Sequence, residues 1–283
     1  MNNIIAVVLY NKEFSSSLTL NNLLHITLTD THLVIINNGP NEIKFDSLYY
    51  ELKSKFTSVT YLEYLENRSL AVIYNTIINN YNEYDRFILF DDDTNISDLF
   101  FQDMQNYYNA DVMLQIPRII DSERKLIHYP LCNDRVYNAD IPYTFNVNDK
   151  IISIGSGLVI YKSLVECFRK ANLKLFDERY ALYGVDYSFF RRIQRIKKQY
   201  DIRVQIFSTL EHSLSKTNTS FSEWRHREHL YDYAISCRFY SKSGIHMVLG
   251  MTRCFLREII SCRFNNLKLL TLTFIKGHHP RCH

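Results

Sequence analysis

The chain lacks several features that would mark particular classes of protein. No stretch of its 283 residues approaches the ~18 consecutive apolar residues of a membrane-spanning segment. Its first ten residues carry no basic leader and no small-residue cleavage site, and the apolar run stops at Asn11. They predict a first β-strand and not a signal peptide, so we expect a cytoplasmic protein.

Excess charge and paired cysteines are also missing. The net charge of +3 is too small to predict nucleic-acid binding by the chain as a whole. Six cysteines show no CxxC spacing, as expected of a reduced cytoplasmic protein. Glycine (7) and proline (5) are scarce, but 46% hydrophobic and 22% charged residues are ordinary for a folded chain and exclude wholesale disorder.

The first ninety residues alternate between strand-like and helix-like segments. Short apolar runs predict strands over Ile4–Tyr10, Leu33–Ile36, Val59–Leu62 and Phe87–Phe90. Helical spacing of apolar residues predicts helices near Ser17–His25 and over Ser69–Asn80. This order predicts an α/β fold with a mostly parallel sheet flanked by helices.

Beyond residue 95 the pattern is less regular. Mostly loop is expected over Ile119–Lys150, and a strand-like run over Ile151–Tyr161 contains Gly155, Ser156 and Gly157. The remaining predicted elements are strands at Asp111–Ile116 and Ile202–Phe207 and helices at Leu164–Ala171 and Val185–Lys197. From Phe221 the chain is predicted to be helical, basic and aromatic. We therefore expect a main domain over residues 1–220 and a helical extension over 221–283.

Three carboxylates, Asp91, Asp92 and Asp93, follow the fourth predicted strand directly. Packing three acids together is unfavourable unless a cation or a hydrogen-bonded ligand offsets their repulsion. Ligands of open α/β sheets bind at the carboxyl ends of the strands, and a divalent cation there could join carboxylates to a diphosphate. The alternative is a solvated turn rich in Asp. An EF-hand loop is excluded, because Ile96 and Gln102 stand where Gly and Glu are required.

Several segments, in the right order over residues 4–240, resemble a family-2 glycosyltransferase of the GT-A fold. They are Val7–Asn11, Val34–Gly39, Glu66–Ala71 with Asn75, the DxD-like Asp91–Asp93, Phe176–Asp186 and His212. The resemblance is to the bacterial rhamnosyl-, galactofuranosyl- and hexosyl-transferases that build surface polysaccharides. It implies a nucleotide-sugar-binding half over 1–95 and an acceptor-binding half over 96–220.

The resemblance also implies roles for individual residues. It places a metal on Asp91, Asp93 and His212, and makes Asp186 the general base of an inverting transfer. Carboxylates suit Mg²⁺, and an added imidazole shifts the preference toward Mn²⁺. Asp186 could also simply cap the helix that follows it. Contacts to the acceptor are expected from Gly155, Ser156 and Gly157, and contacts to the donor from Tyr10, Asn11, Asn37, Asn67, Arg68, Asp91 and Asp92.

Two departures from the family pattern affect the donor site. Asn37 stands where an Asp commonly contacts the pyrimidine, but its amide can still match a uracil or thymine edge. Ser69 replaces the usual Gly. The expected donor is therefore a UDP- or dTDP-sugar. Trp224-Arg225 is not the Gln-x-x-Arg-Trp sequence of processive synthases, so we expect addition of a single sugar.

The extension carries an apolar helical stripe within Met247–Phe264, flanked by Arg253, Arg257 and Arg263. This pattern fits a helix packed on the main domain, and it also fits a basic amphipathic helix on an anionic membrane surface. The family resemblance adds a lipid-linked or growing polysaccharide as acceptor, as in O-antigen or capsule synthesis.

The overall prediction is a metal-dependent, inverting, non-processive glycosyltransferase that is peripheral to the inner face of the cell membrane. Two alternatives remain. A nucleotidyltransferase-like enzyme would also hold Mg²⁺ on such acids, but it should have a Gly-rich phosphate loop, and Tyr10–Glu13 has none. A catalytically inactive homologue could act as a membrane-associated scaffold in glycan assembly.

Overall fold

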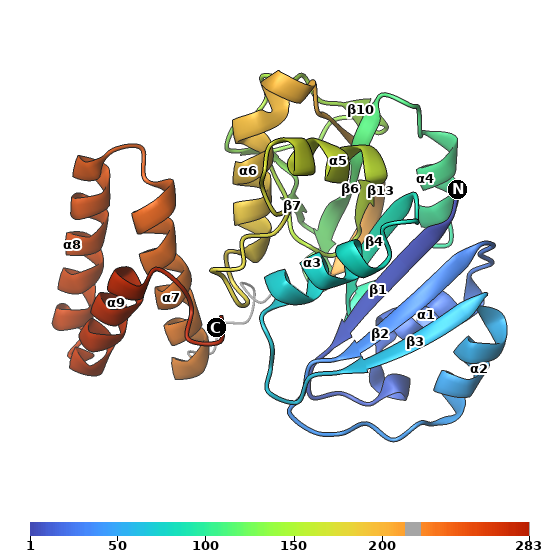
Figure 1. Ribbon diagram of the computed structural model, residues 1–283, viewed down its shortest axis with the longest axis horizontal. Coiled ribbons are helices and arrows are strands. Elements are labelled where there is room, and N and C mark those ends of the chain that lie inside the picture. Colours follow the sequence, from blue (N-terminus) through green and yellow to red (C-terminus); the bar gives the residue numbers. More distant parts are fainter. Residues whose placement is uncertain (213–221, 283) are drawn as a thin grey trace.

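The computed structural model describes residues 1–212 and 222–282. We call the first range the α/β domain and the second the C-terminal extension; Figure 1 shows the two side by side. The predicted boundary near residue 221 lies outside the described residues.

A large mixed sheet forms the centre of the α/β domain. Parallel strands run in the order β3, β2, β1 and β4, and β12 then lies antiparallel between β4 and β6. The next strand, β13, is parallel to β6. The bounds of these strands are β1 Asn3–Leu9, β2 Thr31–Asn37, β3 Ser58–Glu63, β4 Arg86–Asp91, β6 Val112–Asp121, β12 Leu158–Tyr161 and β13 Arg203–His212.

Short strands complete the sheet edges and a small second sheet. In the main sheet β5 and β10 pair with β13, and β7 pairs with β6; β11, β8 and β9 form the second sheet. Their bounds are β5 Thr94–Asn95, β7 Ile127–Tyr129, β8 Leu131–Cys132, β9 Arg135–Val136, β10 Tyr143–Thr144 and β11 Ile151–Ile152.

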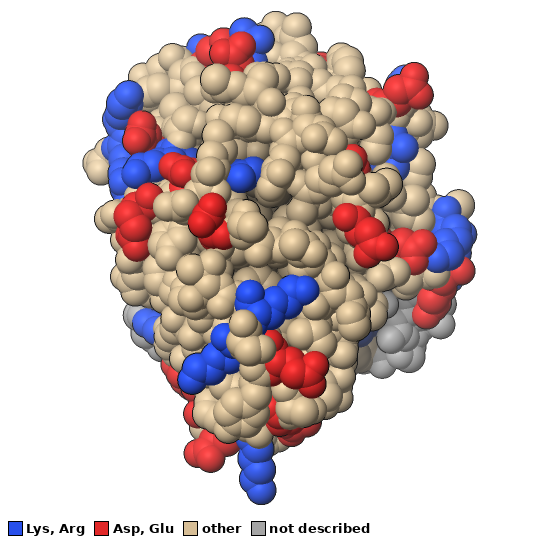
Figure 2. All heavy atoms as spheres, turned by 90° about the vertical axis from the view of Figure 1, so that its right-hand side faces the viewer, with Lys and Arg blue, Asp and Glu red and all other residues tan. Residues whose placement is uncertain are grey.

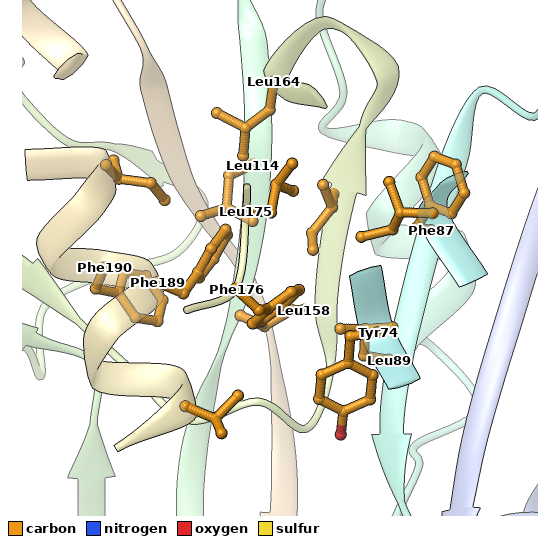
Figure 3. Packing of buried hydrophobic residues seen from close by; sticks show 14 of the residues in the cluster. Tyr74, Phe87, Leu89, Leu114, Leu158, Leu164, Leu175, Phe176, Phe189 and Phe190 are labelled. Atoms are coloured by element: carbon orange, nitrogen blue, oxygen red, sulfur yellow. The ribbon is translucent and has the colours of Figure 1, made fainter. Parts of the chain in front are cut away.

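Helices cover both faces of the main sheet because its strands are apolar on both sides. Along β1, Ile4 and Ala6 join the core under α3, α5 and α6, whereas Ile5 and Val7 join the core under α1, α2 and α4. Figure 3 shows the first core, with α6 residues packed against side chains of the sheet. The helices are α1 Leu18–His25, α2 Ser47–Lys55, α3 Leu70–Asn80, α4 Phe100–Asn106, α5 Lys162–Lys170 and α6 Val185–Tyr200, with a 3-10 turn η1 at Phe14–Ser16.

Polar residues fix where three of these helices begin. The side chains of Ser17, Asp46 and Ser69 accept hydrogen bonds from backbone N–H groups in the first turns of α1, α2 and α3. Each bond satisfies a donor that the helix itself leaves unpaired. Ser69, the departure from the family glycine, thus serves as the N-cap of α3.

The C-terminal extension is a bundle of three helices, α7 Glu223–Tyr240, α8 Gly244–Ile260 and α9 Phe264–Lys276. Its small core comprises Leu230, Ala234, Cys237, Met251, Cys254 and Leu270. In Figure 1, α7 is nearest to the α/β domain and α8 is farthest from it. No helix of the described residues is long and apolar enough to span a bilayer.

The fold confirms the predicted α/β class, with three local differences. Helices α2 and α4 were not predicted; they are short, with nine and seven residues. The strand-like run over 151–161 is interrupted: β11 ends at Ile152 and β12 begins at Leu158, with a turn at Gly155–Gly157. The predicted loop over 119–150 contains the end of β6 and several short strands.

Candidate active site

The three acids and His212 meet at the carboxyl ends of two strands. Asp91 is the last residue of β4, and His212 is the last residue of β13. Between them, β5 pairs with β13 so that Thr94 lies opposite His212. This pairing brings the imidazole to the turn that carries Asp91, Asp92 and Asp93, as the family resemblance implied.

Asp91, Asp93 and His212 form a compact group of ligating atoms. One atom from each lies within 4.8 Å of the others. His212 Nε2 lies 3.1 Å from Asp91 Oδ2, and Nδ1 lies 3.2 Å from Asp93 Oδ1. The second contact lacks hydrogen-bond geometry, which leaves a buried ring nitrogen directed toward a carboxylate.

The charge balance of this group fits a divalent cation. Burial lowers the pKa of His212, but the two carboxylates outweigh that effect and raise the pKa to about 10. In the absence of a metal, a proton on the imidazole therefore supplies the positive charge that the two acids require. Two carboxylates and one imidazole are a suitable ligand set for Mn²⁺ or Mg²⁺, with an oxygen-rich ligand completing the shell.

Backbone contacts hold the acidic turn in place. The hydroxyl of Thr19 donates to the carbonyl of Asp91 over 2.5 Å. Ser156 Oγ accepts from the Asp91 N–H over 3.2 Å and contacts the Thr94 hydroxyl over 2.5 Å. Side chains from two distant segments, Thr19 and Ser156, therefore fix the acids relative to the sheet.

Asp186 lies in the first turn of α6 and faces the same cavity as the acids. The N-cap of that helix is Gly184, with φ of 84°, so the alternative in which Asp186 is the cap is wrong. Burial, and then the negative charge of Asp91, raise the pKa of Asp186 to about 7, although the Gly155 N–H donates to its carboxylate. A carboxyl group titrating near neutral pH is well tuned to accept a proton.

Gly155, Ser156 and Gly157 are all buried, and none of them lines the cavity. A Cβ added at Gly155 would come within 2.7 Å of Asp186 Oδ1, so only glycine allows this approach. Gly157 has φ of 81° and packs against Pro117 and Leu210. Their positions favour support of Asp91 and Asp186 over direct contact with an acceptor.

The cavity itself has a volume of about 570 Å³, within the ordinary range for small-molecule sites. Its walls come from the strand ends, from the turn before α6 and from α7. The lining residues include Tyr10, Asn38, Asn67, Tyr74, Asp91, Asp92, Asp93, Tyr129, Tyr183, Asp186, Tyr187, Arg191, His212, Trp224, His229 and Asp232.

The residues predicted to bind the donor do not all reach the cavity. Tyr10 and Asn67 line the cavity, whereas the buried Asn37 uses its amide within the protein. The Asn37 NH₂ donates to the Asn41 carbonyl over 2.8 Å and to Glu63 Oε2 over 2.9 Å. Glu63 is also the strand partner of Asn37, so β3 brings a carboxylate to this strand end.

The other donor-side residues also form contacts within the protein. Asn11 has φ of 51° and donates its N–H to the Gly39 carbonyl over 2.7 Å. The guanidinium of Arg68 lies over the Tyr64 ring, 4.8 Å from its centroid. The backbone N–H of Arg68 donates to Asn38 Oδ1 over 2.9 Å.

Asp92 points away from the metal group. Its Oδ1 pairs with Lys12 Nζ at 2.6 Å and its Oδ2 accepts from the Tyr10 N–H at 3.3 Å. Burial raises the pKa of Asp92, although Lys12 acts in the opposite direction. Sequence reasoning missed Lys12, which brings a cation beside the acidic turn.

One wall of the cavity was not predicted, because it comes from the C-terminal extension. Trp224, His229 and Asp232 of α7 line the cavity, and the His229 ring stacks on Tyr183 with centroids 3.9 Å apart. The available signal was that Trp224 is the single tryptophan of the chain. Its place in the cavity depends on how α7 packs, which local patterns do not encode.

The segment after α9 returns to the donor side of the cavity. Arg281 Nη2 pairs with Glu228 of α7 at 2.6 Å, and Arg281 Nη1 donates to the Asn67 carbonyl over 3.2 Å. Asn67 has φ of 54°, so its backbone is in the left-handed region. The His279 N–H donates to the Arg179 carbonyl over 2.8 Å. The extension is thereby bonded to the loop that carries Asn67.

Comparison with solved structures identifies the fold. S. aureus TarS 1-349 in complex with UDP-GlcNAc is 12% identical, with a TM-score of 0.54 over 98% of this chain and 79% of that chain. GalNAc-T7 with UDP, GalNAc and Mn²⁺ is 12% identical, with a TM-score of 0.53 over 85% of this chain and 52% of that one. In another TarS structure the chain spans 43% of the length.

These neighbours are GT-A glycosyltransferases, so the predicted GT-A fold is confirmed. Neither a protein-family model nor a curated protein sequence matches the chain. At such low identity the likeness extends to the fold alone, and the activity must be argued from the site.

Proposed function

We propose that this protein is a glycosyltransferase that uses a nucleotide-sugar donor and a divalent cation. The observation that carries the proposal is the placement of Asp91, Asp93 and His212 at one edge of a GT-A sheet, in the same cavity as Asp186. TarS and GalNAc-T7 were solved with UDP or a UDP-sugar, which supports a uridine nucleotide as the donor carrier.

Each polar residue of the site then has a chemical task. Asp91, Asp93 and His212 would hold the cation, which when bound would neutralise charge on the diphosphate. Asp186 accepts the proton of an acceptor hydroxyl as its oxygen bonds to the anomeric carbon. The bond from that carbon to the diphosphate oxygen breaks, and the nucleoside diphosphate leaves with the electron pair. Attack opposite the leaving group inverts the configuration.

For the donor base we propose recognition by Glu63, whose carboxylate is held in place by the amide of the buried Asn37. Hydrogen bonds from Tyr61 and then from Asn37 lower the pKa of Glu63, so its carboxylate is ionised at neutral pH. A carboxylate can accept the imide N–H of uracil or thymine, which cytosine lacks. Glu63 would then replace the Asp that the family commonly has at position 37. UDP and dTDP are therefore the expected nucleotides.

For the acceptor we propose a saccharide bound along α7. Aromatic rings present apolar faces to sugars, and Trp224 and the stacked pair Tyr183–His229 offer such faces on the wall that α7 forms. A lipid-linked or growing polysaccharide at the cytoplasmic membrane face remains the acceptor class that the family resemblance favours, with one sugar added per encounter.

A donor-hydrolysis screen tests the proposal. Nucleotide sugars carrying UDP, dTDP, GDP and CMP are incubated with the protein and Mn²⁺ or Mg²⁺, and release of the nucleotide is measured. We expect release from one pyrimidine diphosphate sugar, which is lost with a chelator and in Asp93→Ala. Glu63→Gln should alter the preference between bases while leaving metal dependence unchanged. Failure with all donors by a folded, metal-loaded protein would favour the inactive scaffold.

A further inference from the structure

The outward side of helix α8 is unusually apolar for a protein surface. Six aliphatic side chains on it are exposed, up to 73% for Ile245 and 81% for Ile260. We call these residues the α8 outer face: Ile245, Val248, Leu249, Leu256, Ile259 and Ile260. At about 100° per residue they fall within about 120° of the helix circumference. A single exposed aliphatic is ordinary, but a continuous stripe of six marks an interaction surface.

The opposite side of α8 already has its partners. Met251 and Cys254 belong to the small core that α8 shares with α7 and α9. Glu258 is fully buried and contacts His226 of α7 at 3.0 Å and Asn266 of α9 at 2.7 Å. The α8 outer face is therefore distinct from the side of α8 that forms the bundle core, because that side already packs against α7 and α9.

The charges around this face have one sign. Between Ser241 and Lys276 the chain contains a single acid, the buried Glu258. The cations of the same segment are Lys242, Arg253, Arg257, Arg263, Lys268 and Lys276. Arg253 and Arg257 are exposed and lie along one edge of the aliphatic stripe. The exposed charge of α8 and α9 is thus entirely positive.

We propose that the α8 outer face binds the surface of an anionic phospholipid bilayer, with α8 parallel to the membrane plane. The aliphatic stripe enters the boundary between headgroups and acyl chains, and the arginines contact lipid phosphates. A second copy of the chain fits less well, because a two-fold contact would bring like charges together. The surface lies outside the cavity, so the proposal does not depend on the proposed sugar transfer.

Vesicle binding of the full chain tests this proposal. We expect co-sedimentation with vesicles of phosphatidylcholine and phosphatidylglycerol, about tenfold weaker binding to phosphatidylcholine alone, and a loss of binding at high salt. Ile260→Asp with Val248→Asp should weaken anionic-vesicle binding about tenfold or more. Leu99→Asp, which changes an aliphatic of the α/β domain about as exposed as Val248, should leave it unchanged.

Two results would overturn the proposal. One is equal binding of wild type and the double variant to anionic vesicles, with circular dichroism showing that both are folded. The other is a dimer in lipid-free solution that the double variant dissociates, measured by light scattering. The second result would assign the α8 outer face to self-association.

Discussion

In the α/β domain the large apolar side chains lie inside, on both faces of the sheet, whereas in the C-terminal extension many of them lie on the surface. Particular acids of the two regions also differ in their surroundings. The α/β domain directs Asp91, Asp93 and Asp186 into an open cavity, while the extension buries Glu228 and Glu258 among cationic partners.

Figure 2 adds the outer surface of the α/β domain to this comparison. On the face that it shows, Lys and Arg are interspersed with Asp and Glu over a largely uncharged surface. On the described surface of α8 and α9, by contrast, all of the exposed charged residues are cations, and they accompany exposed aliphatic residues. Under the two proposals the regions have different tasks: the α/β domain would provide the chemistry, and the extension would combine a wall of the cavity with an outward membrane-binding surface.

The largest expected effect is on catalysis, from Asp186→Asn. Removing the proposed general base should lower the rate of transfer by about 10²–10⁴-fold while leaving nucleotide affinity within a few-fold. Steady-state kinetics and calorimetry of the same preparation separate the two quantities. An unchanged rate would assign the base to another group of the cavity.

For the same variant we also predict how the stability of the metal-free protein changes with pH. The pKa of Asp186 is raised to about 7 in the folded state, above the ~4 expected when unfolded. The contribution of Asp186 to the free energy of unfolding of the wild type is therefore fully present below about pH 4, and it is lost as the pH rises toward 7. Asp186→Asn should be more stable than wild type at pH 8, with a smaller difference at pH 5.

Truncation of an apolar side chain should have very different effects on the free energy of unfolding in the two regions. Phe189→Ala removes a fully buried ring of α6 and should lower the free energy of unfolding by about 3–5 kcal/mol. Leu256→Ala, in the α8 outer face, should change it by less than about 0.5 kcal/mol. Urea denaturation measures both. A large loss in Leu256→Ala would mean that the outer face already has an intramolecular partner.

When an acidic side chain is removed, we expect the larger loss of stability in the extension and the smaller one in the α/β domain. Glu258→Ala leaves His226 and Arg263 without their buried carboxylate and should destabilise the extension by about 3 kcal/mol. Its control is Glu211→Ala, which breaks an exposed pair with Lys125 and should cost at most about 1 kcal/mol. Hydrogen exchange resolved by segment locates the loss. Equal, small effects would contradict the structural role of the buried acids.

The smallest predicted effect links the two regions. Arg281→Ala removes the contact from the extension to the Asn67 carbonyl, and it should raise the KM for the donor a few-fold with little change in kcat, about 1 kcal/mol or less. Arg281→Lys should restore part of the affinity. An effect on kcat alone would show that the contact does not act through donor binding.

Local sequence patterns predicted the parts of the fold that local physics determines. Uniformly apolar runs identified β1, β2 and β4, and helical periodicity identified α3 and α6. The approach of Asp91 to His212 was expected from the family resemblance, because 121 residues separate them. The element that joins them, the two-residue strand β5, has no periodicity that a sequence could reveal.

What the sequence could not predict depends on packing between distant segments. Gly155 was expected to contact the acceptor, whereas its close approach to Asp186 follows from the position of α6. Trp224 reaches the cavity because α7 packs beside it, and Arg281 reaches the Asn67 carbonyl because the chain turns back after α9. Residue types and spacing carry no information about such docking.

The most direct test of the central claim is calorimetric binding of UDP with and without Mn²⁺. We predict metal-dependent binding to wild type, loss of that binding in Asp93→Ala, and unchanged binding in Leu256→Ala. Binding of UDP with the same affinity in Asp93→Ala, or no binding of any nucleoside diphosphate by the folded, metal-loaded protein, would contradict a nucleotide-diphosphate site built on Asp91, Asp93 and His212.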